Sequence, residues 1–162
     1  GYADALSTIG PELSKRGIPF HVFVTPEKLT SGDPRYLSTP ELCELATIPG
    51  ATIGAHGATH RSLTSLSIAD AEADLRSSKQ QLEDILQTPI TTMSYPYGHV
   101  NELVREAAQR VGFSVAACSK WGVNNEHSDA LLLNRLDMWA GDNSRTIENK
   151  VLGYWNFLGR RT

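Results

Sequence analysis

The sequence contains no uninterrupted apolar run of the roughly eighteen residues that a membrane span requires. It also opens without the charged and then apolar pattern of a leader peptide. Neither sign of charge dominates, because the net charge is −3 and the pI is about 5.9. This balance gives no electrostatic support to a nucleic-acid or anionic-membrane partner. We therefore expect a soluble chain with no nucleic-acid partner and no membrane span, in a compartment that the sequence does not indicate.

Cysteine is scarce as well, since Cys43 and Cys118 are the only two in 162 residues. They lie far apart in the sequence and form none of the close-spaced patterns that bind structural metals or carry redox chemistry. We predict two buried free thiols rather than a disulfide.

Linkers, low-complexity tracts and internal repeats are missing too, so no boundary between domains is indicated. A chain of 162 residues with 40% hydrophobic content is long enough for one core. We therefore predict a single domain over residues 1–162. Because "GYADAL" begins at Gly1 with no strand or turn before it, we expect this domain to be incomplete at its N-terminus. The sequence does not indicate the number of chains in an assembly.

Short strand patterns alternate with helical patterns along the chain. The strands are expected at residues 19–25, 51–55, 90–96, 113–118 and 131–136. The helices are expected at residues 4–16, from Pro40 with Thr39 as N-cap, at 68–86 with Ser67 as N-cap, at about 101–110, and at about 144–158 with Ile147, Val151, Trp155 and Leu158 on one stripe. This alternation is typical of parallel βαβ units, which build either an open sheet or a closed barrel.

Three polar stretches follow predicted strands directly. They are "GAHGATH" after residues 51–55, "PYGH" after the strand that begins at residue 90, and "LDMW" at the end of residues 131–136. In both parallel architectures, active sites collect where the strands end. We therefore expect the three stretches to lie at the same rim of the sheet.

His56 and His60 are spaced for a metal site only if the loop between them coils. In an extended strand they would lie about 13 Å apart, whereas a helical turn brings their Cα atoms to about 6 Å. Gly57 permits such a bend. A catalytic zinc typically takes three protein ligands and a water, so a third ligand, preferably a carboxylate, is required. The alternative is a pair of surface histidines on a glycine-rich loop, or one histidine at the start of the following helix.

The stretch "SYPYGH" combines Pro96, which fixes the entry to a turn, with Gly98, which permits a conformation that other residues resist. A turn of this kind can present the backbone N–H of Tyr97 to a developing oxyanion. Alternatively it is a strand-to-helix turn with a packed tyrosine.

Together, "HGATH", "YPYG" some 35 residues on, and the opening "GYADAL" followed by "GIPFHVFVTP" resemble the NodB-homology polysaccharide deacetylases, the family four carbohydrate esterases. The resemblance extends from Gly1 to about Cys118. It implies an α/β fold, a distorted (β/α) barrel of about seven strands. It also implies a divalent metal, with zinc as the expected ion, and an N-acetylated carbohydrate substrate from which acetyl groups are removed.

The same resemblance implies roles for individual residues. His56 and His60 would be the metal ligands, Tyr97 would act through its backbone N–H, and Pro96 and Gly98 would shape the substrate side of the turn. In this family an Asp-Asp pair, supplying the general base and the third ligand, comes on the first strand immediately before a Gly like Gly1. Neither aspartate is present in this chain, so we expect the N-terminal strand to be missing.

The general acid is harder to assign, because the family's late Leu-x-His element does not occur after Trp139. His99 adjoins the turn and is the candidate. His127 lies in a polar loop and is expected to be solvated, and His21 is expected to be structural.

Three further residues are candidates from the segment 135–142. The family often has an arginine two residues before the proline of its turn, where this chain has Ser94, and Arg135 is a substitute candidate for positioning a carboxylate. Asp137 would orient an acid, and Trp139 would form an apolar wall for the acetyl methyl group. The alternatives are helix capping for Asp137 and strand-end packing for Trp139.

The remaining helical carboxylates, namely Glu72, Asp74, Glu83, Asp84 and Glu102, are expected on solvated faces. Two other functions remain open beside the deacetylase. One is a catalytically inactive carbohydrate-binding domain of the same fold. The other is an amidohydrolase that acts on a small non-sugar amide.

Overall fold

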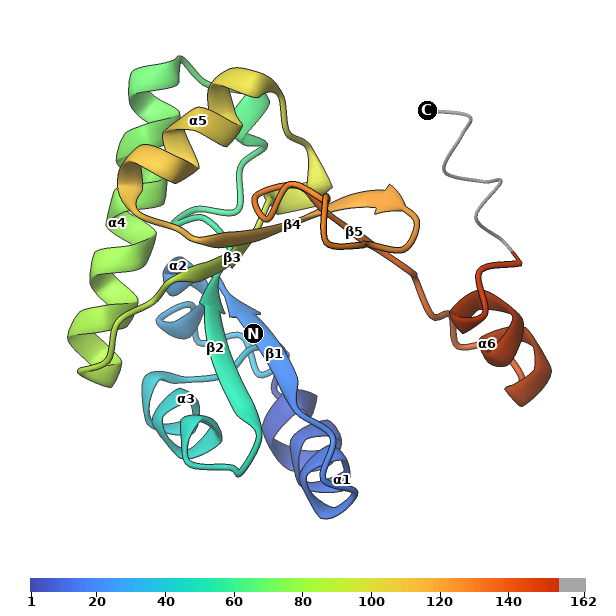
Figure 1. The fold of residues 1–162 in the computed structure, drawn as a ribbon. Coiled ribbons are helices and arrows are strands. Elements are labelled where there is room, and N and C mark those ends of the chain that lie inside the picture. The colour runs from blue at the N-terminus through green and yellow to red at the C-terminus, as the bar shows by residue number, and fades with distance from the viewer. Residues whose placement is uncertain (155–162) are drawn as a thin grey trace.

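A five-stranded parallel sheet forms the centre of the computed structural model, which describes residues 1–154 (Figure 1). The order of the strands in the sheet follows their order in the sequence. The strands are β1 (Phe20–Val24), β2 (Ala51–Ala55), β3 (Thr92–Ser94), β4 (Val115–Trp121) and β5 (Leu133–Arg135). The predicted α/β class with a parallel sheet is confirmed. The described residues form five strands, with β1 and β5 at the two ends of the order, and a barrel of about seven strands stays a prediction.

Helices lie in the connections from β1 to β2, from β2 to β3 and from β3 to β4, as is usual for parallel pairing, whereas residues 122–132 join β4 to β5 without a helix. The helices are α1 (Gly10–Lys15), preceded by a π-helical segment at Ala5–Ile9, α2 (Pro26–Leu29), α3 (Thr39–Ala46), α4 (Ile68–Leu86), α5 (Glu102–Val111) and α6 (Ser144–Val151). Short 3-10 segments lie at Leu63–Ser65 and Pro96–Gly98. Figure 1 shows α4 and α5 side by side beside the sheet, whereas α6 stands apart beyond β5.

Capping side chains set the helix starts. Ser67 Oγ accepts a hydrogen bond from the backbone N of Asp70 at 3.2 Å, which confirms the predicted start of α4. The prediction of Thr39 as N-cap is wrong by one residue. Ser38 is the N-cap of α3, and its backbone N donates to Glu41 Oε2 at 2.7 Å. The capping box with Glu41 satisfies the free N–H groups at this end, so the helix begins one residue earlier than Pro40 indicates.

The core lies between the sheet and α3, α4 and α5. Its largest fully buried apolar side chains are Leu37, Leu42, Leu45, Leu63, Leu75, Leu82, Met93 and Tyr95. Cys118 is buried against this core, but the prediction that Cys43 is buried is wrong. Leu42 and Leu45 take the inward positions of α3, so Cys43, one residue further along the helix from Leu42, faces solvent. Both cysteines are free thiols.

The C-terminal helix α6 is shorter in the described residues than its pattern predicts. Asn143 caps it by accepting a hydrogen bond from the backbone N of Thr146 at 3.0 Å. Ile147 and Val151 are exposed, so the described residues do not cover the predicted apolar stripe, and Trp155 and Leu158 lie outside the described residues. The ammonium of the buried Lys150 holds α6 to the segment before it through the backbone carbonyl of Asp137 at 2.8 Å.

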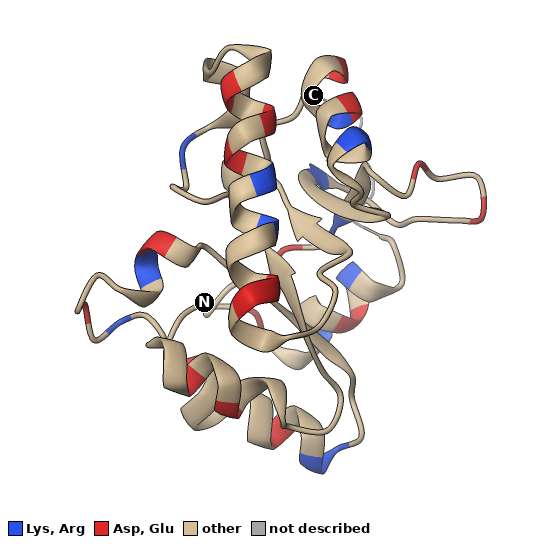
Figure 2. Ribbon diagram, turned by 90° about the vertical axis from the view of Figure 1, so that its left-hand side faces the viewer, with Lys and Arg blue, Asp and Glu red and all other residues tan. Residues whose placement is uncertain are grey.

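Charged residues of both signs are spread along the outer side of α4, which faces the viewer in Figure 2. Asp84 and Glu102 are exposed as expected, and Glu72 and Glu83 are partly covered in ion pairs with arginine and lysine. No helix within residues 1–154 combines the length and the apolar character that crossing a bilayer would need.

Asp74 contradicts the expectation of a solvated face, because it is only 7% exposed. Its carboxylate accepts hydrogen bonds from the backbone N of Ala58 at 2.8 Å and from Thr59 Oγ1 at 2.7 Å. Asp74 lies on the same stripe of α4 as the buried Ala71 and Leu75 and therefore points at the sheet. It fastens the loop that follows β2 to α4.

We predict that Asp74→Ala lowers the free energy of unfolding by about 2 kcal/mol, because the buried N–H of Ala58 loses its acceptor. Urea unfolding of the variant and the parent protein measures this difference. Asp84→Ala on the exposed side of the same helix is the control, with an expected change within about 0.5 kcal/mol. Equal effects of the two substitutions would show that Asp74 does not support the loop.

Candidate active site

The first histidine of the pair is fixed at the carboxyl end of β2. The backbone N of His56 donates to the carbonyl of Val24 at 2.9 Å, and its carbonyl accepts from Thr25 Oγ1 at 3.0 Å. Its ring Nδ1 lies 2.7 Å from the carbonyl oxygen of Ser94, at the end of β3. Because a carbonyl only accepts, Nδ1 carries the proton, and in the neutral ring Nε2 keeps a free lone pair.

His60 reaches the same place because the loop between the two histidines coils back. Gly57 and His60 both have positive φ, at 70° and 58°. Gly57 is further restricted because an added Cβ would lie 2.9 Å from Asp74 Oδ1. The ring centroids of His56 and His60 lie 4.9 Å apart with the planes at 66°. The coiled loop therefore brings the two imidazoles face to edge.

Burial keeps both imidazoles neutral. Desolvation lowers the pKa of His56 from 6.5 to about 4, and the bond to Ser94 opposes this only in part. Burial also lowers the pKa of His60, and the positive charge of Lys28 adds to the effect. At neutral pH both rings are therefore unprotonated bases with lone pairs available to a cation.

The turn Pro96–Gly98 lies against the second histidine. The ring centroid of Tyr97 is 4.8 Å from that of His60, and its side chain is 59% exposed. Tyr97 itself has φ of 59°, a conformation that non-glycine residues adopt rarely and that recurs at functional sites. Gly98 packs so closely on β4 that an added Cβ would lie 2.2 Å from Ser119 Cβ. Only glycine fits there, and this packing holds the turn at the rim.

A cavity of about 660 Å³ opens beside the imidazoles, and we call it the histidine hollow. Its polar lining consists of Tyr2, His21, Lys28, Tyr36, His56, His60, Ser94, Tyr97 and Arg135. Gly1 also lines it. Arg135 enters from β5, and its Nε donates to the carbonyl of Cys118 at 2.7 Å. The structure thus gathers His56, His60, Tyr97 and Arg135 around one cavity.

The other candidates lie outside the lining of this cavity. His99 is the nearest of them to the turn, since its ring centroid is 5.8 Å from that of Tyr97 and its Nδ1 lies 3.1 Å from Ser62 Oγ. Asp137 and Trp139 follow β5 on an exposed segment, where Trp139 is 67% exposed. Pro96 is the buried first residue of the turn. His127 is exposed in its loop, as expected.

Four lining residues were not singled out from the sequence as members of a site: Tyr2, Lys28, Tyr36 and His21. Lys28 had a usable signal, because it follows the carboxyl end of β1 at the same rim as the histidine loop. His21 was expected to be structural, but it is exposed and lines the cavity. Tyr36 lies in the loop before α3, where no pattern of the sequence indicates a site.

The described residues supply some, but not all, of the ligands that a divalent cation would need. Two neutral imidazoles side by side supply two of the three protein ligands that a catalytic zinc typically has. The hydrogen bond from His56 Nδ1 to a backbone carbonyl is the usual way in which a ligating histidine is oriented. Within residues 1–154, no group of three histidine, cysteine or acidic side chains is arranged to hold a metal ion.

Comparisons with known proteins agree with the family resemblance seen in the sequence. The family model for polysaccharide deacetylase matches residues 1–116. YxkH of Bacillus subtilis (strain 168), a candidate polysaccharide deacetylase by name, is 24% identical over 141 residues. That match covers 87% of this chain and 50% of YxkH, so this chain spans about half the length of that relative.

Solved structures with the same fold include two deacetylases. The Streptococcus pyogenes deacetylase PplD in complex with acetate superposes with a TM-score of 0.85 at 19% identity, over 92% of this chain and 66% of PplD. A de-N-acetylase from Aggregatibacter actinomycetemcomitans gives 0.80 at 15% identity, over 93% of this chain and 71% of that protein. At such identities these likenesses show the fold alone.

The family model covers well over half of the chain, and the matched residues include both the histidine loop and the Pro-Tyr-Gly turn. The resemblance in the sequence is thereby confirmed. The chain belongs to the polysaccharide deacetylase family, with the NodB-homology domain of the family four carbohydrate esterases.

Proposed function

We propose that this protein is a metal-dependent hydrolase that removes N-acetyl groups from an amino sugar or polysaccharide. The observation that carries the proposal is the pair of neutral imidazoles, 4.9 Å apart, at the rim where parallel-sheet enzymes place their active sites. Family membership supports an acetylated carbohydrate as the substrate. The acetate in the Streptococcus pyogenes structure is the product that such a reaction would release.

His56 Nε2 and a ring nitrogen of His60 would hold the metal, most simply zinc. A bound divalent cation polarises a carbonyl and lowers the pKa of its water. The third ligand would be a carboxylate that enters beside Gly1, which lines the histidine hollow. Ser94 Oγ is buried, lines the same cavity and has no hydrogen-bond partner among residues 1–154, so it is a donor left for that carboxylate.

The turn would stabilise the negative charge that develops on the substrate, and Arg135 would position a carboxylate beside it. The backbone N–H of Tyr97 would donate to the oxyanion of the acetamide carbon, and Pro96 and Gly98 hold the turn in the required conformation. The guanidinium of Arg135 is fixed through one N–H to the carbonyl of Cys118. Its other N–H groups would position a carboxylate in the cavity.

The leaving amine needs a proton, and His99 is the proposed donor because it stands next to the turn with its ring held by Ser62. Asp137 would orient the acid, and Trp139 would cover the acetyl methyl group. Both lie on the exposed segment after β5, so these roles require the substrate to reach across from the turn to that segment.

We predict that His56→Ala and His60→Ala in the full-length protein each weaken zinc binding by at least about 100-fold. Each removes a ligand, and losing only a residue that hydrogen-bonds to a ligand can already weaken metal binding by about 10- to 100-fold. A competition titration against a zinc indicator measures this. His127→Ala is the matched control, since His127 lies in an exposed loop. Zinc affinities that are equal in all four proteins would rule out a metal site at this pair.

We also predict that the full-length protein releases acetate from N-acetylglucosamine oligomers when loaded with zinc and stops when a chelator removes the metal. Acetate is quantified directly in both conditions. Equal rates with and without chelator would contradict the metal mechanism. Binding of the oligomers with no release of acetate would favour an inactive carbohydrate-binding domain. Release from small non-sugar amides but not from oligomers would favour the amidohydrolase.

A further inference from the structure

Lys28 places a positive charge at the edge of the histidine hollow. It lies in α2, directly after β1, and lines the cavity together with His60 and Tyr36. Its ammonium stands 5.7 Å from the centroid of the Tyr36 ring. Lys28 is therefore close to the site where the acetyl group would be removed.

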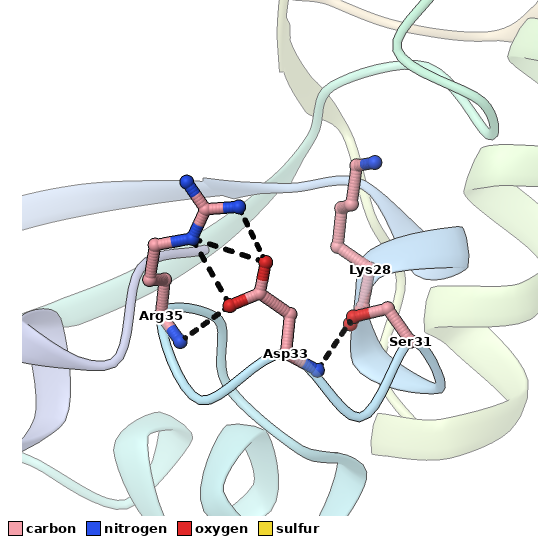
Figure 3. Close-up of polar contacts among 4 residues, drawn as sticks. All are labelled: Lys28, Ser31, Asp33 and Arg35. Carbon is pink, nitrogen blue, oxygen red and sulfur yellow. Dashed lines mark hydrogen bonds and ion pairs between the residues drawn. The ribbon is translucent and has the colours of Figure 1, made fainter.

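The acidic residue in the loop between α2 and α3, Asp33, is paired with Arg35 and acts on Lys28 only through its charge at longer range. Asp33 is bound by Arg35 through Nε at 3.0 Å to each carboxylate oxygen and through Nη2 at 2.6 Å (Figure 3). These bonds lower the pKa of Asp33 to about 2, so the pair stays ionised. Figure 3 shows the lysine side chain extending away from this pair. No carboxylate of residues 1–154 lies within ion-pair distance of Lys28 Nζ.

Two stacked tyrosine rings lie next to the ammonium of Lys28. Tyr2 and Tyr36 stack with centroids 5.2 Å apart and planes at 19°, and both line the hollow. The backbone pairing of Tyr2 with Tyr36 fixes the stack. Tyr2 is 59% exposed, so its ring offers an open face of the kind on which an apolar face of a sugar ring can rest.

The lining of the hollow is one-sided in charge. Apart from histidine and the α-amino group of Gly1, its ionisable groups in residues 1–154 are the cations Lys28 and Arg135 and the tyrosines, with no carboxylate among them. Arg135 is anchored to Cys118 and belongs to the site proposed above. Lys28 lies in α2, which follows β1 at the other end of the strand order from β5, and the function proposed above assigns no role to its charge.

We infer that Lys28, with Tyr36 and Tyr2 beneath it, forms a subsite for an anionic group, a carboxylate or a phosphate, on a sugar next to the one that loses its acetyl group. The substrate would then be an acidic glycan rather than a neutral one. No described carboxylate forms an ion pair with the ammonium of Lys28, and the carboxylate proposed beside Gly1 would be bound to the metal. An anion supplied by the ligand would therefore gain a charge-assisted hydrogen bond, which is about twice as strong as a neutral one. This inference rests on the proposed function for the position of the acetylated sugar.

The experiment uses the full-length protein in chelator, so that binding is measured without turnover. The probes are three N-acetylglucosamine tetramers in which one sugar carries a carboxylate, a phosphate or a neutral carboxamide. We expect the better anionic tetramer to bind about tenfold more tightly than the carboxamide, which is the size of one charged hydrogen bond. The tighter of the two anions identifies the group. Calorimetry gives the dissociation constants.

Lys28→Met should remove this preference and leave the affinity for the carboxamide unchanged, whereas Lys28→Arg should keep the preference. Lys15→Met is the matched control, since Lys15 is an exposed lysine of α1 outside the hollow. Equal binding of all three tetramers by the parent protein, no binding of any, or a preference that survives Lys28→Met would overturn the inference. A preference without acetate release in zinc would instead contradict the proposed function alone.

Discussion

The hydrogen bond from His56 Nδ1 to the carbonyl of Ser94 ties the histidine loop to the next strand of the sheet. It joins the residue after β2 to the last residue of β3, so the position of the imidazole follows from the parallel pairing of the two strands. It also fixes the tautomer, because a carbonyl cannot donate. Sheet geometry thus determines that the free lone pair is on Nε2, and a chain that pairs these strands in another register would lose the hydrogen bond that selects this tautomer.

Asp74 completes this arrangement from the other side. Its carboxylate accepts hydrogen bonds from the backbone N of Ala58 and from Thr59 Oγ1, and both residues lie between the two histidines. The same carboxylate leaves no room for a side chain at Gly57. The sequence contained the information that places Asp74 inside. It occupies the stripe of Ala71, Leu75, Ser78 and Leu82 on α4, and helical periodicity assigns that stripe to the core. For both Asp74 and Cys43, the position on the helix decides burial and the residue type does not.

Sequence patterns were sufficient for the strands, for the cap at Ser67, and for the meeting of the histidine loop with the Pro-Tyr-Gly turn, because each depends on local chemistry or on the common rim of parallel strands. They were not sufficient where long-range packing decides. Tyr36 reaches the hollow only through its pairing with Tyr2. Whether a stripe on α6 is buried depends on what packs against it, and Ile147 and Val151 lie uncovered by the described residues.

Charge explains why a carboxylate is the fitting third ligand. Lys28 and Arg135 line the same hollow as the two imidazoles, and burial keeps those imidazoles neutral. A divalent cation entering this lining meets positive charge and two neutral donors, and taking an uncompensated charge out of water is costly. A neutral third donor would complete the coordination but leave the charge uncompensated. A carboxylate does both, and the guanidinium of Arg135, already fixed to Cys118, would then face a negative partner rather than a bare cation. The positive charge of Lys28, on the β1 side of the hollow, would then be matched by an anionic group of the substrate.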